Sequence, residues 1–195
     1  MQEDSMKNIW RAVTGSLLCV ALLAAAPKDE NKEHNDAFIA GSPSENRIAR
    51  EVRHELVTLP YYGVFDDLAF RVNGSTVTLL GAVTRPTLKS DAERATKSVE
   101  GVTQVVNEIE VLPLSPMDDQ SRMAMYRAIY GQSSISTRYG FRAVPSIHIL
   151  MKNGHATLEG VVATKADKDL INITANGVPN VFSVTNNLQV ENAGK

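Results

Sequence analysis

One sequence motif occurs twice in this chain, and its repetition limits the folds that the chain can adopt. NGSTVTLLGAV occupies residues 73–83, and NGHATLEGVV occupies residues 153–162. In both, Asn-Gly precedes a run of alternating polar and apolar residues, which is typical of a β-hairpin. The similarity extends to VVNEIEV at 105–111 and VTNNLQV at 184–190. Self-similarity at this separation predicts a duplicated domain of about seventy residues, too long for a solenoid repeat.

Aligning the two copies on Gly81 and Gly160 shows where they differ. We expect one gap, in the hairpin turn, where the first copy carries an extra residue at Ser75. Before the last strand, Gly101 of the first copy is replaced by Asn180. Gly81 and Gly160 each end a strand where a side chain would block close packing, so we expect them to be structural. The predicted structural glycines are Gly74, Gly81, Gly154 and Gly160.

The first copy predicts the order helix, strand, strand, helix, strand. Ser42-Pro43-Ser44-Glu45 has the form of a capping box, and apolar residues then recur every fourth position along one helix face. Alternating strands follow at 68–72 and 76–83, then a second amphipathic helix with Leu88 on its apolar face. Residues 105–111 close the copy as a third strand.

The second copy repeats this order. Ser115-Pro116-Met117-Asp118 mirrors the first cap, SIHILM and HATLEGVV form the hairpin, and a helix runs from about Ala166 to Asn176. The predicted fold class is α+β: two tandem small α-β-β-α-β units, each a three-stranded mixed sheet with two helices on one face. We expect the first domain at 43–112 and the second at 115–191.

The residues before the first copy predict an export signal. A short basic stretch from Met6 precedes the apolar run AVTGSLLCVALLAAA, which has the length of a signal-peptide core. We expect a signal peptide at 1–26, a charged, flexible linker at 27–42 and a periplasmic location for the rest. Retention of the segment as a membrane anchor, or lipid modification at Cys19, are the alternatives.

The arrangement of motifs resembles the BON domain. The resemblance rests on a glycine, a short alternating strand, a second glycine, a helix, Gly-Val and the pattern V-x-N-x-Φ-x-V, and it covers about residues 43–190. Two copies behind an export signal resemble the osmotically inducible periplasmic proteins and the dual-BON outer-membrane lipoproteins. This resemblance implies a role in the envelope under osmotic or other stress, and an association with phospholipid.

No pattern in the sequence indicates catalysis. The four histidines show no metal-ligand spacing, Cys19 is the only cysteine, and nucleophile and phosphate-loop motifs are absent. We therefore expect no enzyme activity, no cofactor and no metal. The net charge of −2 gives no support for binding to nucleic acid.

One feature distinguishes the second copy. From Gln120 to Leu158 there is no acidic residue, whereas the first copy mixes acids with its arginines. If Met125 and Ile129 face the core, a second stripe of Met, Tyr and Arg lies on another side of the same helix. Such a stripe suits an anionic membrane interface. The candidate lipid-binding residues are Arg122, Met123, Tyr126, Arg127, Tyr130, Arg138 and Arg142.

Together with these patterns, the resemblance to the BON domain implies a non-enzymatic periplasmic envelope-maintenance protein whose second BON domain binds anionic phospholipid membranes. Packing of the Met/Tyr/Arg stripe against the first domain is the main alternative for that surface. For the whole protein the alternative is a periplasmic chaperone or adaptor that binds protein partners of the envelope. A third, weaker hypothesis is a small polar ligand between the domains.

Overall fold

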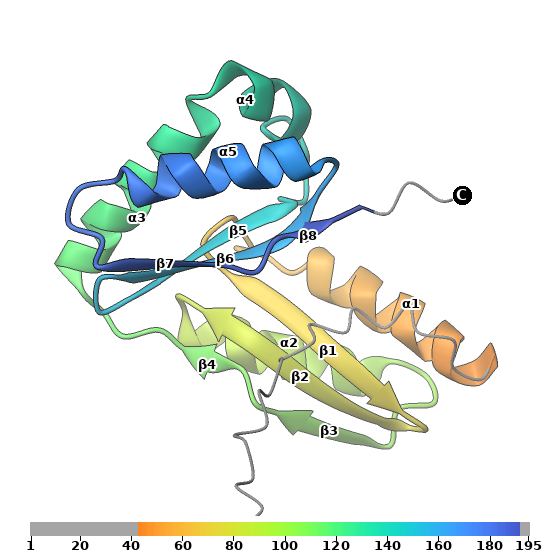
Figure 1. Ribbon diagram of the computed structural model, residues 1–195. Helices are drawn as coiled ribbons and strands as arrows, with labels where there is room; N and C mark the ends of the chain where they lie inside the picture. Colours follow the sequence, from red (N-terminus) through yellow and green to blue (C-terminus); the bar gives the residue numbers. More distant parts are fainter. Residues whose placement is uncertain (1–42, 192–195) are drawn as a thin grey trace, which may run out of the picture. The chain divides into compact units, whose positions relative to one another are not determined.

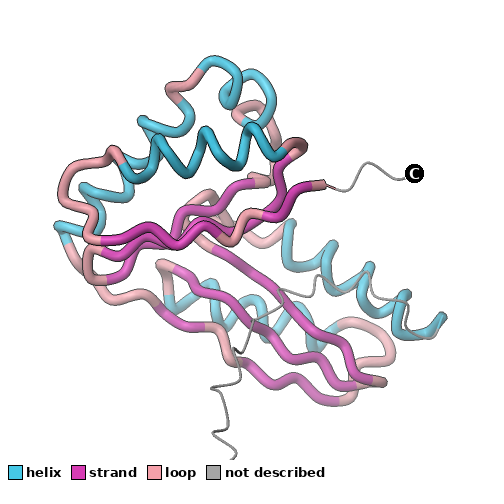
Figure 2. Tube along the Cα trace, in the orientation of Figure 1, coloured by secondary structure: helices cyan, strands magenta, loops and turns pink. Residues whose placement is uncertain are grey.

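The structure, a computed structural model, describes residues 43–191 (Figure 1). The predicted signal peptide at 1–26 and linker at 27–42 lie outside the described residues. The described part is α+β and consists of two tandem units, as predicted. Figure 2 shows the alternation of helix and strand along both.

The first unit has the predicted order of elements. It comprises α1 (Pro43–Val57), β1 (Asp67–Asn73), β2 (Thr76–Val83), α2 (Pro86–Ser98), β3 (Gln104–Asn107) and β4 (Glu110–Val111). β1 and β2 pair antiparallel, and β3 and β4 both pair parallel to β2. A mixed sheet results, with β2 at its centre.

The second unit repeats this topology and adds one helix. It comprises α3 (Pro116–Tyr130), α4 (Ser133–Tyr139), β5 (Ile147–Lys152), β6 (His155–Val162), α5 (Lys165–Asn176), β7 (Ser183–Asn186) and β8 (Gln189–Val190). β6 is the central strand, antiparallel to β5 and parallel to β7 and β8. The short helix α4 was not expected from the sequence and has no counterpart in the first unit.

The third strand of each unit is divided into two short strands, β3 and β4 in the first and β7 and β8 in the second. An asparagine at the same place in both units explains the division. The Asn107 Oδ1 atom accepts a hydrogen bond from the Ile109 N–H at 3.2 Å, and its Nδ2 donates to the Lys89 carbonyl at 3.0 Å. Asn186 makes the same pair of bonds, to the Leu188 N–H and the Lys168 carbonyl. The asparagine thus turns the chain between two short strands and ties it to the preceding helix.

The expected extra residue at Ser75 is wrong. Asn73 pairs with Thr76, so the first hairpin has a two-residue turn of Gly74 and Ser75. In the second hairpin, Lys152 pairs with His155, which leaves Asn153 and Gly154 as the turn. The two turns have equal length, and the Asn-Gly dipeptides that suggested a gap lie one position apart in the two copies.

Each unit has its own apolar core between its helices and one sheet face. In the first unit, Val52 of α1, Leu79 of β2 and Leu88 of α2 are among the buried side chains. In the second, Met125 and Ile129 of α3 face the core, as the sequence predicted. α3 and α5 cover the same face of the sheet in Figure 1.

The glycines at 81 and 160 lie where strands approach the preceding chain closely. Gly160 has a φ of +116°, and a Cβ atom there would lie 2.2 Å from the Ser146 carbonyl oxygen. Gly81 has a φ of +102°, and a Cβ would lie 2.3 Å from the Asp67 carbonyl oxygen. Both positions therefore exclude any side chain.

Candidate functional site

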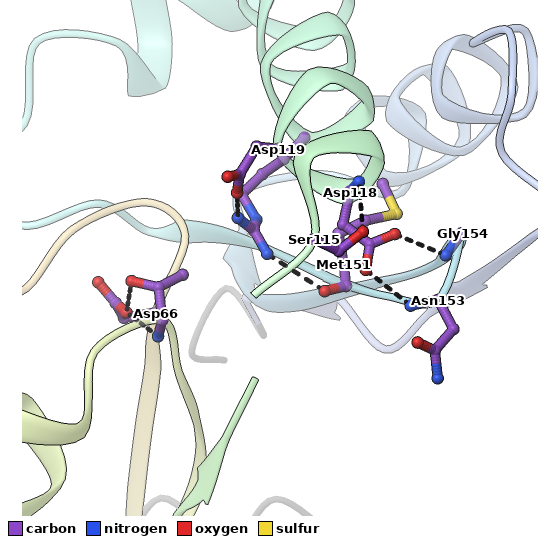
Figure 3. A network of polar contacts seen from close by, with 9 residues as sticks. Asp66, Ser115, Asp118, Asp119, Met151, Asn153 and Gly154 are labelled. Carbon is purple, nitrogen blue, oxygen red and sulfur yellow. Dashed lines mark hydrogen bonds and ion pairs between the residues drawn. The ribbon is translucent and has the colours of Figure 1, made fainter. Parts of the chain in front are cut away.

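The helix that carries most of the candidate residues, α3, is fixed to the hairpin of its own unit. The Ser115 Oγ caps α3 by accepting a hydrogen bond from the Asp118 N–H at 3.2 Å. The Asp118 carboxylate accepts hydrogen bonds from the backbone N–H groups of Asn153 and Gly154, each at 2.8 Å (Figure 3). Because these bonds join the start of α3 to the β5–β6 turn, they set which faces of the helix meet the sheet.

Arg122 lies at the outer edge of β5. Only 6% of the residue is exposed, its Nη2 donates to the Met151 carbonyl at 3.2 Å, and its Nη1 forms an ion pair with Asp119. The guanidinium carbon also lies 5.8 Å from the centre of the Phe65 ring. With these contacts, Arg122 is a poor candidate for direct contact with a membrane.

Tyr130 and Tyr126 complete the cover of this strand edge. The Tyr130 hydroxyl donates to the Ile147 carbonyl at 3.4 Å, while the Ile149 N–H donates to the Val64 carbonyl at 2.8 Å. The Tyr126 ring lies 4.8 Å from the Tyr130 ring. Burial, with a smaller effect from Tyr126, raises the pKa of Tyr130 to about 12. These contacts hide an otherwise exposed strand edge, which is a common site of unwanted association.

The Tyr126 ring also meets the connection between α1 and β1. It lies 6.0 Å from the Phe65 ring in an edge-to-face arrangement and keeps 36% of its surface exposed. For Arg122 and Tyr126, the arrangement therefore favours the alternative in which the stripe packs on the first domain.

Met123 and Arg127 lie four residues apart on α3 and are both exposed. Met123 has 40% of its surface exposed. Arg127 has no carboxylate within salt-bridge distance in the described part of the chain. Side chains at this spacing lie on one side of a helix, so the two present a combined apolar and cationic surface.

α4 and the residues after it carry the remaining candidates. Arg138 forms an ion pair with Asp167 of α5, and the Tyr139 hydroxyl donates to the same carboxylate at 2.8 Å. Burial by itself raises the pKa of Asp167, but hydrogen bonds from Tyr139, Thr164 and Arg138 outweigh it and hold that pKa below its usual range. Arg138 is therefore partly neutralised.

Arg142 differs from Arg138 in having no carboxylate within salt-bridge distance among residues 43–191. Its guanidinium carbon lies 5.7 Å from the centre of the Tyr139 ring. Phe141, directly before it, is 87% exposed. Sequence reasoning missed Phe141, although an aromatic residue beside an arginine in an acid-free stretch could have identified it.

The cations of the acid-free stretch thus fall into two classes. Arg122, Arg138 and Lys152 pair with carboxylates that lie outside the stretch, namely Asp119, Asp167 and Glu110. Arg127 and Arg142 do not, and each lies beside an exposed apolar side chain. The unpaired arginines therefore provide most of the positive charge that this segment can offer to a partner.

Metal-binding clusters, the buried histidine and the hydropathy of the helices are the remaining features of residues 43–191 that bear on function. Within residues 43–191, no cluster of three or more His, Cys, Asp or Glu side chains could hold a metal ion. His148 is buried, with its Nε2 atom 3.3 Å from the Tyr62 hydroxyl. No helix in this range has the length and hydropathy to cross a bilayer.

Comparison with known proteins identifies the repeated unit. A sequence model of the BON domain matches residues 44–113 and 136–192. No curated protein matches the chain. The C-terminal domain of CdsD, the structural protein of the Type III secretion system of Chlamydia trachomatis, is 14% identical, and the match covers 78% of this chain and 99% of that chain with a TM-score of 0.29.

A second solved structure of CdsD is also 14% identical, covers 71% of this chain and 90% of that chain, and has a TM-score of 0.27. Both likenesses are too weak to carry an argument. The family match takes in the larger part of the sequence in two segments, one in each unit. The chain belongs to the BON domain family and carries two BON domains.

Proposed function

We propose that this protein is a non-catalytic component of the cell envelope that binds anionic phospholipid membranes through its second BON domain. The proposal rests on one observation about the segment without acidic residues. Two of its arginines have no carboxylate partner among residues 43–191, and each lies beside an exposed apolar side chain. Met123 accompanies Arg127 on α3, and Phe141 accompanies Arg142 after α4.

Family membership supports the general part of this proposal. BON domain proteins are generally periplasmic or otherwise envelope-associated, and they are generally non-catalytic. The association of the family with phospholipid supports the choice of ligand. A periplasmic location, an export signal and a role in osmotic or envelope stress belong to the same proposal.

The contacts of the candidate residues narrow the binding surface. Arg122, Tyr126 and Tyr130 are engaged at the edge of β5, and Arg138 is paired with Asp167. The proposed membrane surface therefore rests on Met123, Arg127 and Arg142, with the other candidates in supporting positions.

The expected energetics are modest and depend on salt. A basic residue near an anionic membrane surface contributes about 1 kcal/mol, so the two unpaired arginines contribute about 2 kcal/mol together. Exposed charges are screened over about 10 Å at 0.1 M salt, so added salt should weaken binding. Apolar contact of Met123 or Phe141 with the bilayer adds a contribution to the binding free energy that salt does not remove.

Co-sedimentation of residues 27–195, which leave out the predicted signal peptide and its apolar run, with vesicles tests the proposal. The wild type should sediment with vesicles that contain anionic phospholipid and remain free with zwitterionic vesicles. The Arg127→Glu/Arg142→Glu variant should lose most of this binding. The matched control, Arg71→Glu/Arg85→Glu, makes the same change of charge at exposed sites of the first domain and should bind as the wild type does. Arg85 lies over the Tyr61 ring as Arg142 lies over the Tyr139 ring. Equal binding by both variants would overturn the proposed surface.

Binding of protein partners is the second candidate function, and a separate observation favours it. Leu114, between the two domains in sequence, is 95% exposed, and Met117 at the start of α3 is also exposed. Large apolar side chains held in water are common at protein-binding surfaces. An adaptor of this kind would suppress aggregation of an unfolded client without lipid, and Leu114→Ser/Met117→Ser would abolish that activity while leaving vesicle binding unchanged.

A further inference from the structure

We propose that the loop after α4, residues 140–144, inserts the Phe141 side chain into the boundary between headgroups and acyl chains of an anionic bilayer. This inference rests on the proposed function and names the part of the second domain that enters the membrane. Surface attraction by the arginines brings the domain to the bilayer, and Phe141 holds it there.

The exposure of Phe141 is the first observation. An aromatic side chain that is 87% exposed keeps nearly all of its apolar surface in water. Val144, in the same loop, is also exposed. Entry into the interfacial region of a bilayer removes that apolar surface from water, which favours insertion.

The attachment of the loop is the second observation. Tyr139, two residues before Phe141, is buried. Its hydroxyl donates to Asp167 at 2.8 Å and accepts a hydrogen bond from the Ala163 N–H at 2.8 Å. Arg138 pairs with the same carboxylate. The base of the loop is thereby fixed to α5 and to the end of β6, so presenting Phe141 costs little conformational entropy on binding.

The difference between the two domains is the third observation. In the first domain, residues 58–66 join α1 to β1, and the segment ends in the buried Asp66, whose carboxylate accepts a hydrogen bond from the Thr84 N–H at 2.7 Å. In the second domain, residues 131–146 make the same connection, contain α4 and carry no acidic residue. The Phe141 loop therefore lies in a connection that is longer than its counterpart in the first domain and differs from it in charge.

Charge complementarity identifies the occupant as a membrane surface. Arg142 follows Phe141, has no carboxylate within salt-bridge distance among residues 43–191, and is placed over the Tyr139 ring. At an anionic bilayer the phosphate groups lie above the hydrocarbon. The Arg142 guanidinium would therefore meet phosphate where the Phe141 ring enters the apolar layer. Residues that dominate protein–protein binding instead cluster together and are surrounded by further contacts that exclude water. Phe141 has Gly140 and Arg142 as its neighbours in the chain.

Fluorescence of the full chain tests insertion directly. Trp10 is the only tryptophan, so a Trp10→Phe/Phe141→Trp variant reports on position 141 alone. On vesicles that contain anionic phospholipid, its emission should shift to shorter wavelength, and lipids with brominated acyl chains should quench it. A Trp10→Phe/Ile173→Trp variant is the matched control, because Ile173 on α5 is also well exposed. Its emission should stay unchanged.

Removal of the ring gives an independent measurement. Phe141→Ser should weaken partition into anionic vesicles by roughly tenfold, since burial of a Phe side chain is worth that much or more. Ile173→Ser should bind like the wild type. Circular dichroism checks that both variants remain folded, as expected for exposed positions.

The outcomes separate this inference from the proposed function. Vesicle binding by the wild type, with no emission shift in the Trp10→Phe/Phe141→Trp variant and no effect of Phe141→Ser, overturns the inference and leaves the proposed function standing. Absence of vesicle binding by the wild type overturns both. A blue shift with quenching, together with weaker binding of Phe141→Ser, establishes the loop as the inserted element.

Discussion

The Asp118 carboxylate accepts a hydrogen bond from the Gly154 backbone N–H, with 2.8 Å between Oδ1 and nitrogen (Figure 3). In the first domain, the Glu45 carboxylate accepts one from the Gly74 N–H at the same distance. A carboxylate in the first turn of the first helix thus fixes the hairpin turn in both domains. This contact explains why both helices carry an acid at that position.

Replacement of Asp118 should weaken the second domain. In Asp118→Ala, the N–H groups of Asn153 and Gly154 both lose their hydrogen-bond acceptor. Hydrogen bonds to a charged group contribute more to stability than bonds between neutral groups. We expect a loss of about 2–4 kcal/mol in the free energy of unfolding, measured with urea. Glu45→Ala removes the acceptor of the Gly74 N–H, a hydrogen bond that is more exposed to water, and should cost less stability. An equal or larger loss for Glu45→Ala would contradict this explanation.

Gly160 should tolerate no side chain. In Gly160→Ala, the Cβ would lie 2.2 Å from the Ser146 carbonyl oxygen at a φ of +116°, so the backbone must shift. We expect a loss of about 3 kcal/mol or more in stability. Gly74→Ala is the matched control: its φ of +61° is also positive, but nothing lies within 4 Å of the added atom, so about 1 kcal/mol is expected. Thermal unfolding of both variants gives the comparison.

Asp167 should make the stability of the second domain depend on acid pH. Its pKa in the folded state is lower than its unfolded value of about 3.9. Its contribution to stability is therefore fully present above the unfolded pKa and is lost as pH falls through the folded pKa. Asp167→Asn should be less stable than the wild type at about pH 7, and the difference should shrink as the pH falls below about 4.

Asp169 provides the control for the substitution. It is exposed on the same helix and pairs with Lys165, so Asp169→Asn should change the free energy of unfolding at about pH 7 by less than about 1 kcal/mol. If Asp167→Asn and the wild type differed by a constant amount across the acid range, the network of Tyr139, Thr164 and Arg138 around Asp167 would not govern its titration.

Two arginines of α3 should respond in opposite ways to the same substitution. Arg122→Met removes a buried donor to the Met151 carbonyl and should cost about 1–3 kcal/mol in stability. Arg127→Met alters an exposed residue and should leave stability within about 0.5 kcal/mol while weakening vesicle binding. Urea unfolding and co-sedimentation of both variants check this. Loss of stability in Arg127→Met would show that its side chain has a structural role.

Much of the fold follows from local patterns in the sequence. Both hairpins, the second helix of each unit and the buried Met125 and Ile129 are predicted by hydrophobic periodicity. The difference between Gly101 in the first copy and Asn180 at the corresponding position of the second also has a local reason. Both residues have positive φ, at +93° and +61°, a conformation that asparagine tolerates better than most residues.

The rest depends on contacts that periodicity does not reveal. When a helix has two apolar stripes, its sequence does not show which stripe another segment covers. The sequence therefore could not distinguish the packed residues Tyr126 and Arg122 from the exposed residues Met123 and Arg127. α4 is only seven residues long, too short for a helical pattern to stand out. The exposure of Phe141 follows from α4 and its anchor at Tyr139, which the sequence did not predict.

Membrane binding by the second domain is tested by the fraction of residues 27–195, without the predicted signal peptide, that sediments with vesicles as lipid charge and salt are varied. We expect binding to vesicles with anionic phospholipid at about 0.05 M salt, clearly weaker binding at about 0.5 M, and little binding to zwitterionic vesicles at either. Equal binding to both lipids, or binding that salt does not change, would show that the second domain does not bind membranes through its charge.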